Sequence, residues 1–271
     1  MLRNAIYDSS NDNVMRSTTR RAYMDEVVTL LNKISESSTH LTTKSSYTYS
    51  GRTVPRTTEI LSSMIFEEYI PVWANSLGFK HKGYRTALKE ASDKGTYTHE
   101  SIERFLQTST LPEYASFPPL AKDAVYFAFN SFLKWWDDIN KGNEVELIFS
   151  EKTLSCKYFG GTLDCLLKIN GKYWLIDFKT SNHMSFKYCL QLSSYKYMLK
   201  ECENIDVAGC LVLMLEKKKI HYSEYVLDLA IEEHRNFMQR CMEEFMMLTA
   251  AFYGRKEIEY DYKRIFGGKN V

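Results

Sequence analysis

The chain has 271 residues, which is long for one domain but does not require two. Its net charge of +1 gives no overall attraction to nucleic acid, so any such contact must come from local basic patches. Hydrophobic content of 44% and aromatic content of 14% suffice for a large core, and no stretch approaches the roughly 18 apolar residues of a membrane span.

The N-terminal part differs from the rest of the chain. Residues 1–20 are polar, and apolar residues then recur at helical spacing over 24–34, which predicts a first helix. Residues 35–50 are rich in Ser and Thr and predict a loop. We therefore treat 1–50 as a flexible and helical N-terminal extension and 51–271 as one domain.

Helical patterns continue through the first half of the domain. A second helix is expected to start at Thr57, with Thr57 or Thr58 as its N-cap and Pro55 just ahead. Three further helical patterns follow, near 84–92, 95–107 and 119–140.

The pattern then changes to strands. Strands are predicted at 145–149, 154–159, 161–169, 172–180, 207–215 and 220–227, a helix at 185–201, and a long amphipathic helix at 229–253. No repeat or low-complexity linker divides the chain. The expected fold is α/β, with a mixed central sheet flanked by helices and a helical N-terminal section.

Two of these strands are joined by Asn170-Gly171, which predicts a β-hairpin with a two-residue type I′ turn. Counting back from this turn places Asp164 opposite Asp177. Directly opposed Cβ atoms lie about 5 Å apart, and like charges there are destabilising. The pair therefore predicts a cation between the two carboxylates, with an ordinary solvent-facing hairpin side as the alternative.

Alternation along the two strands adds an amine to this pair. It places Lys179 on the same face as Asp164 and Asp177. The opposite face is predicted to be apolar core, formed by Leu163, Cys165, Leu167, Ile169, Trp174, Ile176 and Phe178. Two acids and an amine would then project from one patch of a rigid sheet.

The combination of Asp164 with the acid-x-Lys element at 177–179 resembles the PD-(D/E)xK nuclease superfamily. The segment 95–103 resembles the helix that carries a metal-binding His in the RecB-like exonuclease branch, and His99 is the matching residue. The segment 191–195 resembles the Gln-x-x-x-Tyr motif of that branch.

Two more segments narrow this resemblance. Residues 54–61 and the strand 176–181 resemble the mitochondrial genome maintenance exonucleases and their phage relatives. The resemblance covers roughly residues 50–215. A lone Asp-x-Lys is a weak signal, but several motifs in the expected order on the expected elements are a strong one. The restriction-endonuclease-like form of the fold is implied by this resemblance.

The resemblance implies metal-dependent hydrolysis of DNA, for which divalent ions activate water and relieve negative charge. Asp164 and Asp177 are oxygen ligands suited to Mg²⁺ or Mn²⁺. His99 adds a nitrogen ligand that slightly favours Mn²⁺, and the backbone carbonyl of Phe178 is a further implied ligand. Lys179 would orient the water or stabilise developing charge.

Other implied site residues have ordinary alternatives. Gln191 and Tyr195 could reach the active site and a phosphate, or could be a surface Gln and a core Tyr. Glu103 lies four residues after His99 on one helix face and could orient it, although a solvated Glu is equally consistent. Glu146 is included because related enzymes place an acid on this strand.

Two local patches are candidates for DNA contact. Lys80, Lys82, Tyr84 and Arg85 combine cations with an aromatic ring just before a helix, which suits backbone contact and base stacking on single strands. A solvated charged surface is an equal alternative. Arg56 could bind phosphate together with the N-terminal amides of the second helix.

The six cysteines lack CxxC spacing, which indicates reduced thiols in a reducing, intracellular compartment. Some RecB-like nucleases hold an iron–sulfur cluster with one Cys before the His helix. No Cys precedes Cys156 here, so no such cluster is expected. The resemblance implies the cytoplasm of a phage-infected bacterium, with the mitochondrion as alternative. DNA is the expected partner, no membrane is, and no protein partner is indicated.

The expected function is therefore a metal-dependent DNA exonuclease acting on single-stranded or frayed ends in replication, recombination or repair. One alternative is a structure-specific endonuclease or resolvase on the same scaffold. Another is a catalytically inactive nucleic-acid-binding protein, against which the presence of His99, Asp164, Asp177 and Lys179 argues. A third is an interaction module that assembles through its C-terminal helix.

Overall fold

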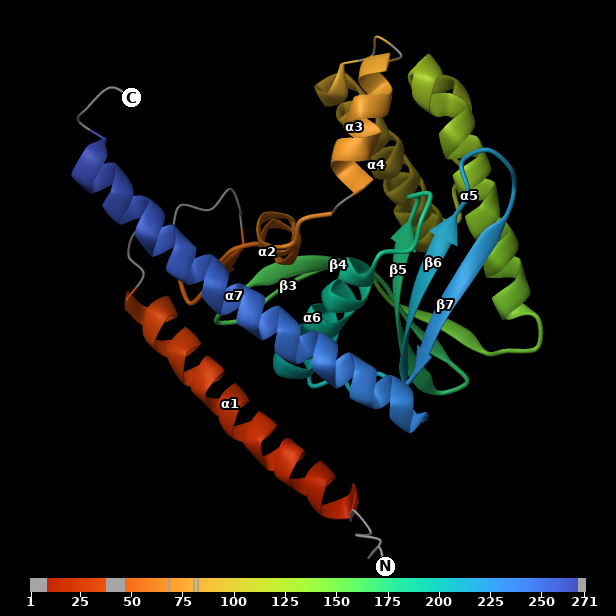
Figure 1. Cartoon of the computed structure of the whole chain (residues 1–271). Helices are drawn as coiled ribbons and strands as arrows, with labels where there is room; N and C mark the ends of the chain where they lie inside the picture. Colours follow the sequence, from red (N-terminus) through yellow and green to blue (C-terminus); the bar gives the residue numbers. More distant parts are fainter. Residues whose placement is uncertain (1–8, 38–46, 68, 80, 82, 268–271) are drawn as a thin grey trace, which may run out of the picture.

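The computed structural model describes residues 9–37, 47–67, 69–79, 81 and 83–267. At its centre lies a five-stranded sheet in the order β3-β4-β5-β6-β7 (Figure 1). Its strands are β3 (Val145–Ser155), β4 (Gly160–Ile169), β5 (Lys172–Lys179), β6 (Gly209–Leu215) and β7 (Tyr222–Asp228). The β5–β6 pair is parallel and the other neighbouring pairs are antiparallel. The predicted mixed central sheet is confirmed.

Helices cover both faces of this sheet (Figure 1). One face is covered by α1 (Ser9–Ser37), α2 (Thr57–Met64), α6 (Phe186–Glu203) and α7 (Glu232–Phe266). The other is covered by α4 (Tyr84–Thr108) and α5 (Pro119–Asn140). The remaining elements are the hairpin of β1 (Thr48–Tyr49) and β2 (Arg52–Thr53), α3 (Tyr69–Phe79) and the short helix η1 (Tyr114–Ser116). Within these described ranges no helix has the length and apolar character needed to cross a membrane.

Each face of the sheet has its own apolar core. Cys165 and Leu167 pack with α5 side chains such as Phe132, whereas Leu166 and Leu175 pack with residues of α6 and α7. Successive residues of a strand point to opposite faces, so burial on both sides explains the near-continuous apolar runs of β4 and β5. The predicted apolar face with Cys165, Leu167 and Ile176 is confirmed, and the opposite face of the hairpin is also largely buried.

One side chain departs from the predicted grouping within β4. Leu163, predicted to share the core of Cys165, belongs to the core of α6 and α7 instead. Asp164, between Leu163 and Cys165, is 8% exposed and thus belongs to the buried interior rather than to an exposed surface.

The predicted hairpin turn is confirmed. Asn170 and Gly171 both have positive φ, 48° and 79°, as a type I′ turn requires. The ladder pairs Ile169 with Lys172 and continues to Cys165 opposite Ile176, in the predicted register. The turn chemistry therefore fixes how β4 and β5 meet.

Several element boundaries differ from the predictions. The first helix starts at Ser9 rather than near residue 24, and the predicted loop 35–50 includes 38–46, which lie outside the described residues. The predicted helices 84–92 and 95–107 are one helix, α4. A β-carbon on Gly95 would stand 3.6 Å from Thr180 Oγ1, so this glycine marks a close approach of β5 and not a break.

Other differences concern β3, α3 and α7. The predicted strands 145–149 and 154–159 are replaced by the single strand β3, which carries a bulge between Leu147 and Phe149. Helix α3 was not predicted. Helix α7 continues to Phe266, well beyond the predicted end at residue 253. Its charged C-terminal part is supported by ion pairs along one helix, such as that of Arg255 with Glu259.

Candidate metal site

The β4–β5 ladder ends one position before Asp164 and Asp177, at the Cys165–Ile176 pair. In place of the next ladder bond, Asp164 Oδ2 accepts a hydrogen bond of 2.7 Å from the N–H of Phe178. The two aspartates are 8% and 1% exposed. The turn thus brings both carboxylates to one buried point, as predicted, but the observed pairing stops just short of them.

Three candidate ligands converge beside this point. His99 of α4, Glu151 of β3 and Asp164 of β4 each offer one ligand atom, and these atoms lie within 4.8 Å of one another. His99 Nδ1 is 3.6 Å from Asp164 Oδ1 and 3.7 Å from Glu151 Oε1. Two ligands of one ion with bonds of about 2.1 Å are separated by about 3–4 Å. The three side chains therefore fit a divalent ion after a small contraction.

Glu151 was missed by the sequence analysis, which chose Glu146 instead. The bulge in β3 shifts the pairing, so that Ser150 lies opposite Cys165 and Lys152 opposite Leu163. Glu151, with a φ of 48°, is thereby level with Asp164. The sequence did contain a sign of this bulge, namely the gap between the predicted strands 145–149 and 154–159. A β-bulge interrupts the alternation of apolar and polar residues along a strand and so produces such a gap.

Glu146 lies elsewhere on the sheet. It pairs with Lys168 across the ladder, and its Oε2 lies 3.9 Å from the Lys168 Nζ. Lys168 is four residues beyond Asp164 on β4, which corresponds to about 13 Å along the strand. The structure does not bring Glu146 to the metal site.

Asp177 has a different neighbour from Asp164. Its Oδ2 lies 2.6 Å from Lys179 Nζ, yet among the described residues neither of its buried oxygens has a hydrogen bond of normal geometry. The Lys179 ammonium also lies 5.0 Å from the ring centre of Tyr188, whose hydroxyl donates to Ser181 Oγ at 2.9 Å. Lys179 is thus held between a carboxylate and an aromatic ring.

The ionisation of this cluster follows from burial and from mutual charge. Burial raises the pKa of Asp177 to about 6, against the opposing effect of Lys179. Burial also disfavours the charged forms of Asp164 and His99. Their mutual attraction nevertheless lowers the pKa of Asp164 and raises that of His99 to about 10. Protonated His99 and Lys179 therefore balance the carboxylates when no cation is bound.

A cavity of about 500 Å³ opens onto these groups. Arg56, the N-cap of α2, lines it, with its guanidinium 5.5 Å from the ring centre of Tyr47. Gln191 and Tyr195 line it from α6, and Gln191 Nε2 donates to the Tyr195 hydroxyl at 2.9 Å. The structure therefore brings Arg56, Gln191 and Tyr195 to the same cavity as the candidate metal ligands.

Two glycines make room for the cavity wall. A β-carbon on Gly160 would lie 2.6 Å from Tyr47 Cβ, and one on Gly161 would lie 2.5 Å from Tyr195 Cε1. Both distances are too short for any side chain, so the Gly-Gly pair before Asp164 lets two tyrosines pack against the start of β4.

Two other predicted site residues, Glu103 and Phe178, also lie near His99. Glu103 lines the cavity but accepts a hydrogen bond from Gln107 at 3.1 Å, while the acids nearest to His99 Nδ1 are Glu151 and Asp164. Phe178 packs its ring edge-on against His99, with ring centres 6.2 Å apart. The role of its carbonyl as a ligand stays a prediction.

The described residues of the predicted DNA-contact segment, Tyr84 and Arg85, lie far from His99. Tyr84 and Arg85 begin α4, and the 15 residues from Tyr84 to His99 correspond to about 22 Å of helix. Tyr84 packs against Trp73, with ring centres 5.5 Å apart, and Arg85 is exposed. Lys80 and Lys82 lie outside the described residues. Of the predicted DNA contacts that are described, Arg56 alone lines the cavity.

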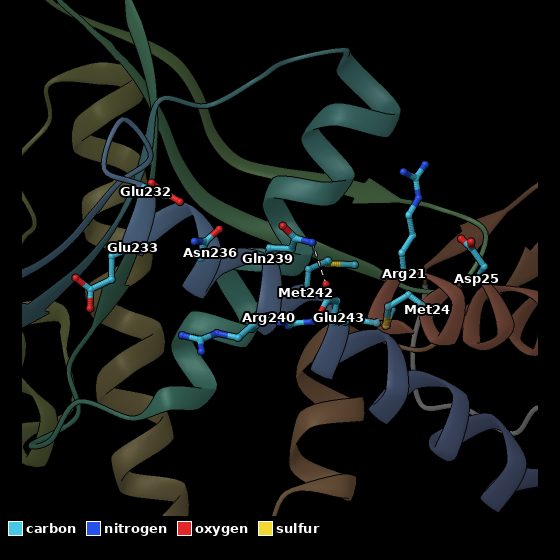
Figure 2. A pocket seen from close by; sticks show the side chains of 11 residues that line it. Arg21, Met24, Asp25, Glu232, Glu233, Asn236, Gln239, Arg240, Met242 and Glu243 are labelled. Atoms are coloured by element: carbon cyan, nitrogen blue, oxygen red, sulfur yellow. Dashed lines mark hydrogen bonds and ion pairs between the residues drawn. The ribbon is translucent and has the colours of Figure 1, made fainter. Parts of the chain in front are cut away.

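A larger cavity of about 1360 Å³ lies between α1 and α7, lined by residues of these two helices (Figure 2). It shares no lining residue with the cavity at His99. Its lining mixes both signs of charge, and Arg20 forms an ion pair with Glu243 there. No candidate metal group was found among its described residues. Size alone therefore does not make it the functional site.

Comparison with known proteins identifies no family. No family model matches the chain, and no curated protein matches it. A solved structure titled "Crystal structure of SSO0001" aligns at 18% identity over 55% of this chain and 71% of that chain, with a TM-score of 0.23. A likeness at this level does not establish a shared family.

Proposed function

We propose that this protein is a metal-dependent deoxyribonuclease that hydrolyses phosphodiester bonds at single-stranded or frayed DNA ends. The observation that carries the proposal is the His99, Glu151 and Asp164 group next to the buried Asp177–Lys179 pair. Three ligands of mixed nitrogen and oxygen type, an amine and an open cavity can together support metal-assisted phosphodiester hydrolysis.

The donor set suits Mg²⁺ or Mn²⁺. His99, Glu151 and Asp164 would hold the ion, and two carboxylates with one imidazole give a harder set than the thiolates that select zinc. When bound, the ion supplies an acidified water and a positive charge for the phosphate oxygens. Asp164 is oriented for this role because its second oxygen is already fixed by the Phe178 N–H.

Lys179 provides a second positive charge for the same reaction. Its side chain is 16% exposed, and its ammonium is positioned by Asp177 and by the Tyr188 ring. A fixed ammonium at the cavity can stabilise charge that develops on a phosphate, without rearranging during the reaction. Asp177 in this interpretation keeps Lys179 charged and in place.

Arg56 and the Gln191–Tyr195 pair complete the proposed substrate site. Arg56 is exposed at the cavity, and its guanidinium packs on the Tyr47 ring. In this position its N–H groups can donate hydrogen bonds to a phosphate. Tyr195 receives the Gln191 amide hydrogen bond, so its hydroxyl proton is available to a ligand. Both features favour an anionic substrate.

The test is digestion of single-stranded and double-stranded DNA labelled at either end, with Mg²⁺, Mn²⁺ or EDTA. We expect metal-dependent release of label, and loss of activity in Glu151→Gln. Glu146→Gln is the matched control, because it makes the same change on the same strand outside the cavity. Equal activity of wild type and Glu151→Gln would remove the basis of the proposal.

Covalently closed circular DNA separates the two nuclease alternatives. An exonuclease leaves closed circles intact and degrades them once they are nicked or linearised, whereas a structure-specific endonuclease cuts a closed substrate that carries its preferred structure. Metal-dependent DNA binding without cleavage of any of these substrates would favour an inactive binding protein instead.

A further inference from the structure

The turn between β6 and β7 carries three consecutive lysines, Lys217 to Lys219. Strand β6 runs parallel to β5, with Met214 opposite Lys179, and ends at Leu215. Lys217 is three residues beyond Met214, or about 10 Å along the strand direction. The lysine turn therefore lies at the same end of the sheet as the Asp177–Lys179 pair.

This turn is anchored to the body of the protein. The Ser131 side chain of α5 is fully buried. Its hydroxyl donates to the carbonyl of Phe127 within α5 at 2.7 Å and accepts from the N–H of His221 at 2.9 Å, while the Lys219 carbonyl lies 3.4 Å away. Glu216 and His221 close the turn through a backbone hydrogen bond of 3.1 Å. The lysines therefore project from a fixed loop.

Helix α4 carries a further lysine, Lys94, near the β6–β7 turn. Gly95 packs against Thr180 at the end of β5, and Gly95 and Thr96 line the metal-site cavity. Lys94 immediately precedes them. The positive charges of Lys94 and Lys218 both act on Lys217, whose pKa is lowered by burial and by these two neighbours. Gly95 lies beside Thr180, the residue after Lys179, and Lys179 is opposite Met214 near the end of β6, so Lys94 and the lysine turn lie at one corner of the sheet. Lys94, Lys217 and Lys218 are here called the lysine cluster.

The lysine cluster has no matched acidic partner. Among the residues that the structure describes, no ion pair within 4.0 Å joins Lys94, Lys217 or Lys218 to a carboxylate. The nearby acid of the turn, Glu216, is paired with Lys219 at 3.4 Å and lies 3.9 Å from His221. Like charges gathered without a counter-charge are unfavourable, and a bound anion offsets that cost.

We propose that Lys94, Lys217 and Lys218 bind backbone phosphates of the DNA strand that enters the metal-site cavity. This inference rests on the proposed function. Lysine is a flexible point charge that binds phosphate without reading sequence, so the lysine cluster would hold the strand in place without selecting its bases. Arg56, on the α2 side of the cavity, would contact the same strand elsewhere.

The test compares Lys217→Gln/Lys218→Gln with Lys172→Gln. Lys172 is exposed and starts β5 at the opposite end of the sheet, so Lys172→Gln measures the effect of losing one positive charge far from the turn. Binding of a labelled single-stranded oligonucleotide is measured in Ca²⁺, chosen as a non-cleaving ion, over a range of salt concentrations. Cleavage is measured in parallel in Mn²⁺, as kcat and KM.

We expect the double variant to bind at least tenfold more weakly near 0.1 M salt, with KM raised to match and kcat nearly unchanged. The slope of log K against log salt should fall by about 0.7 for each phosphate that the variant no longer neutralises. Binding by the double variant that equals that of Lys172→Gln would overturn the inference, as would a wild type that binds no oligonucleotide. Binding that depends on the lysine cluster, without cleavage, would support the inference and contradict the proposed activity.

Discussion

Replacing Lys179 with Ala removes the positive charge that lies 2.6 Å from the buried carboxylate of Asp177. At an effective dielectric constant of about 20, Coulomb's law gives an attraction of about 6 kcal/mol at that distance. Breaking one side of a buried ion pair costs about 3–5 kcal/mol once relaxation is included. We therefore expect Lys179→Ala to lower the free energy of unfolding by about 3–5 kcal/mol, a large share of the stability of a typical domain.

The double variant Asp177→Asn/Lys179→Ala separates charge from packing. It removes the carboxylate left without a partner, so we expect it to recover at least half of the loss. The measurement is urea denaturation followed by circular dichroism, in EDTA, so that no bound cation substitutes for Lys179. A Lys179→Ala variant as stable as wild type would refute the idea that this lysine neutralises a buried acid. Both variants should lack nuclease activity, and the double variant shows that inactivity does not depend on unfolding.

Four further predictions address other parts of the site. Glu151→Gln should weaken Mn²⁺ binding at least tenfold by calorimetry, whereas Glu146→Gln should not change it. Mn²⁺ at a hundred times its Kd should raise the unfolding free energy of wild type by about 2.7 kcal/mol, an increase that urea denaturation should not find in Asp164→Asn. Tyr188→Phe keeps the ring beneath Lys179 and should retain most of kcat, whereas Tyr188→Leu should lower kcat without raising KM. Gly161→Ala should lower the melting temperature, because its β-carbon would lie 2.5 Å from Tyr195 Cε1, whereas Gly78→Ala, with open space around it, should not.

The parts of the site that the sequence could predict are those fixed by local chemistry. Asn170-Gly171 sets the turn, the turn sets the register, and the register brings Asp164 and Asp177 to one end of the β4–β5 ladder. Strand alternation and turn residues act over a few positions, so a single sequence contains them. The predicted helix 119–140 was likewise confirmed, as α5 (Pro119–Asn140).

The parts that could not be predicted depend on irregular backbone or on distant contacts. Glu151 reaches Asp164 because a bulge near Ile148 changes the face of every later residue in β3. Without that bulge, strand alternation would place Glu146 rather than Glu151 on the face of Asp164. Tyr188 touches Lys179 because α6 folds back over the end of β5, a contact that no short-range spacing encodes.

Asp164 links the two halves of the site. One of its oxygens accepts the Phe178 N–H, which belongs to the strand that carries Asp177 and Lys179. The other faces His99, which with Glu151 forms the candidate ligand group. A hydrogen bond to the charged carboxylate favours its ionised form, so the same contact that ends the ladder keeps Asp164 ready to bind a cation. Asp177, without such a bond, depends on Lys179 for its charge balance. The two aspartates that look equivalent in the hairpin therefore have different tasks: Asp164 is suited to hold a cation and Asp177 to hold the amine beside it.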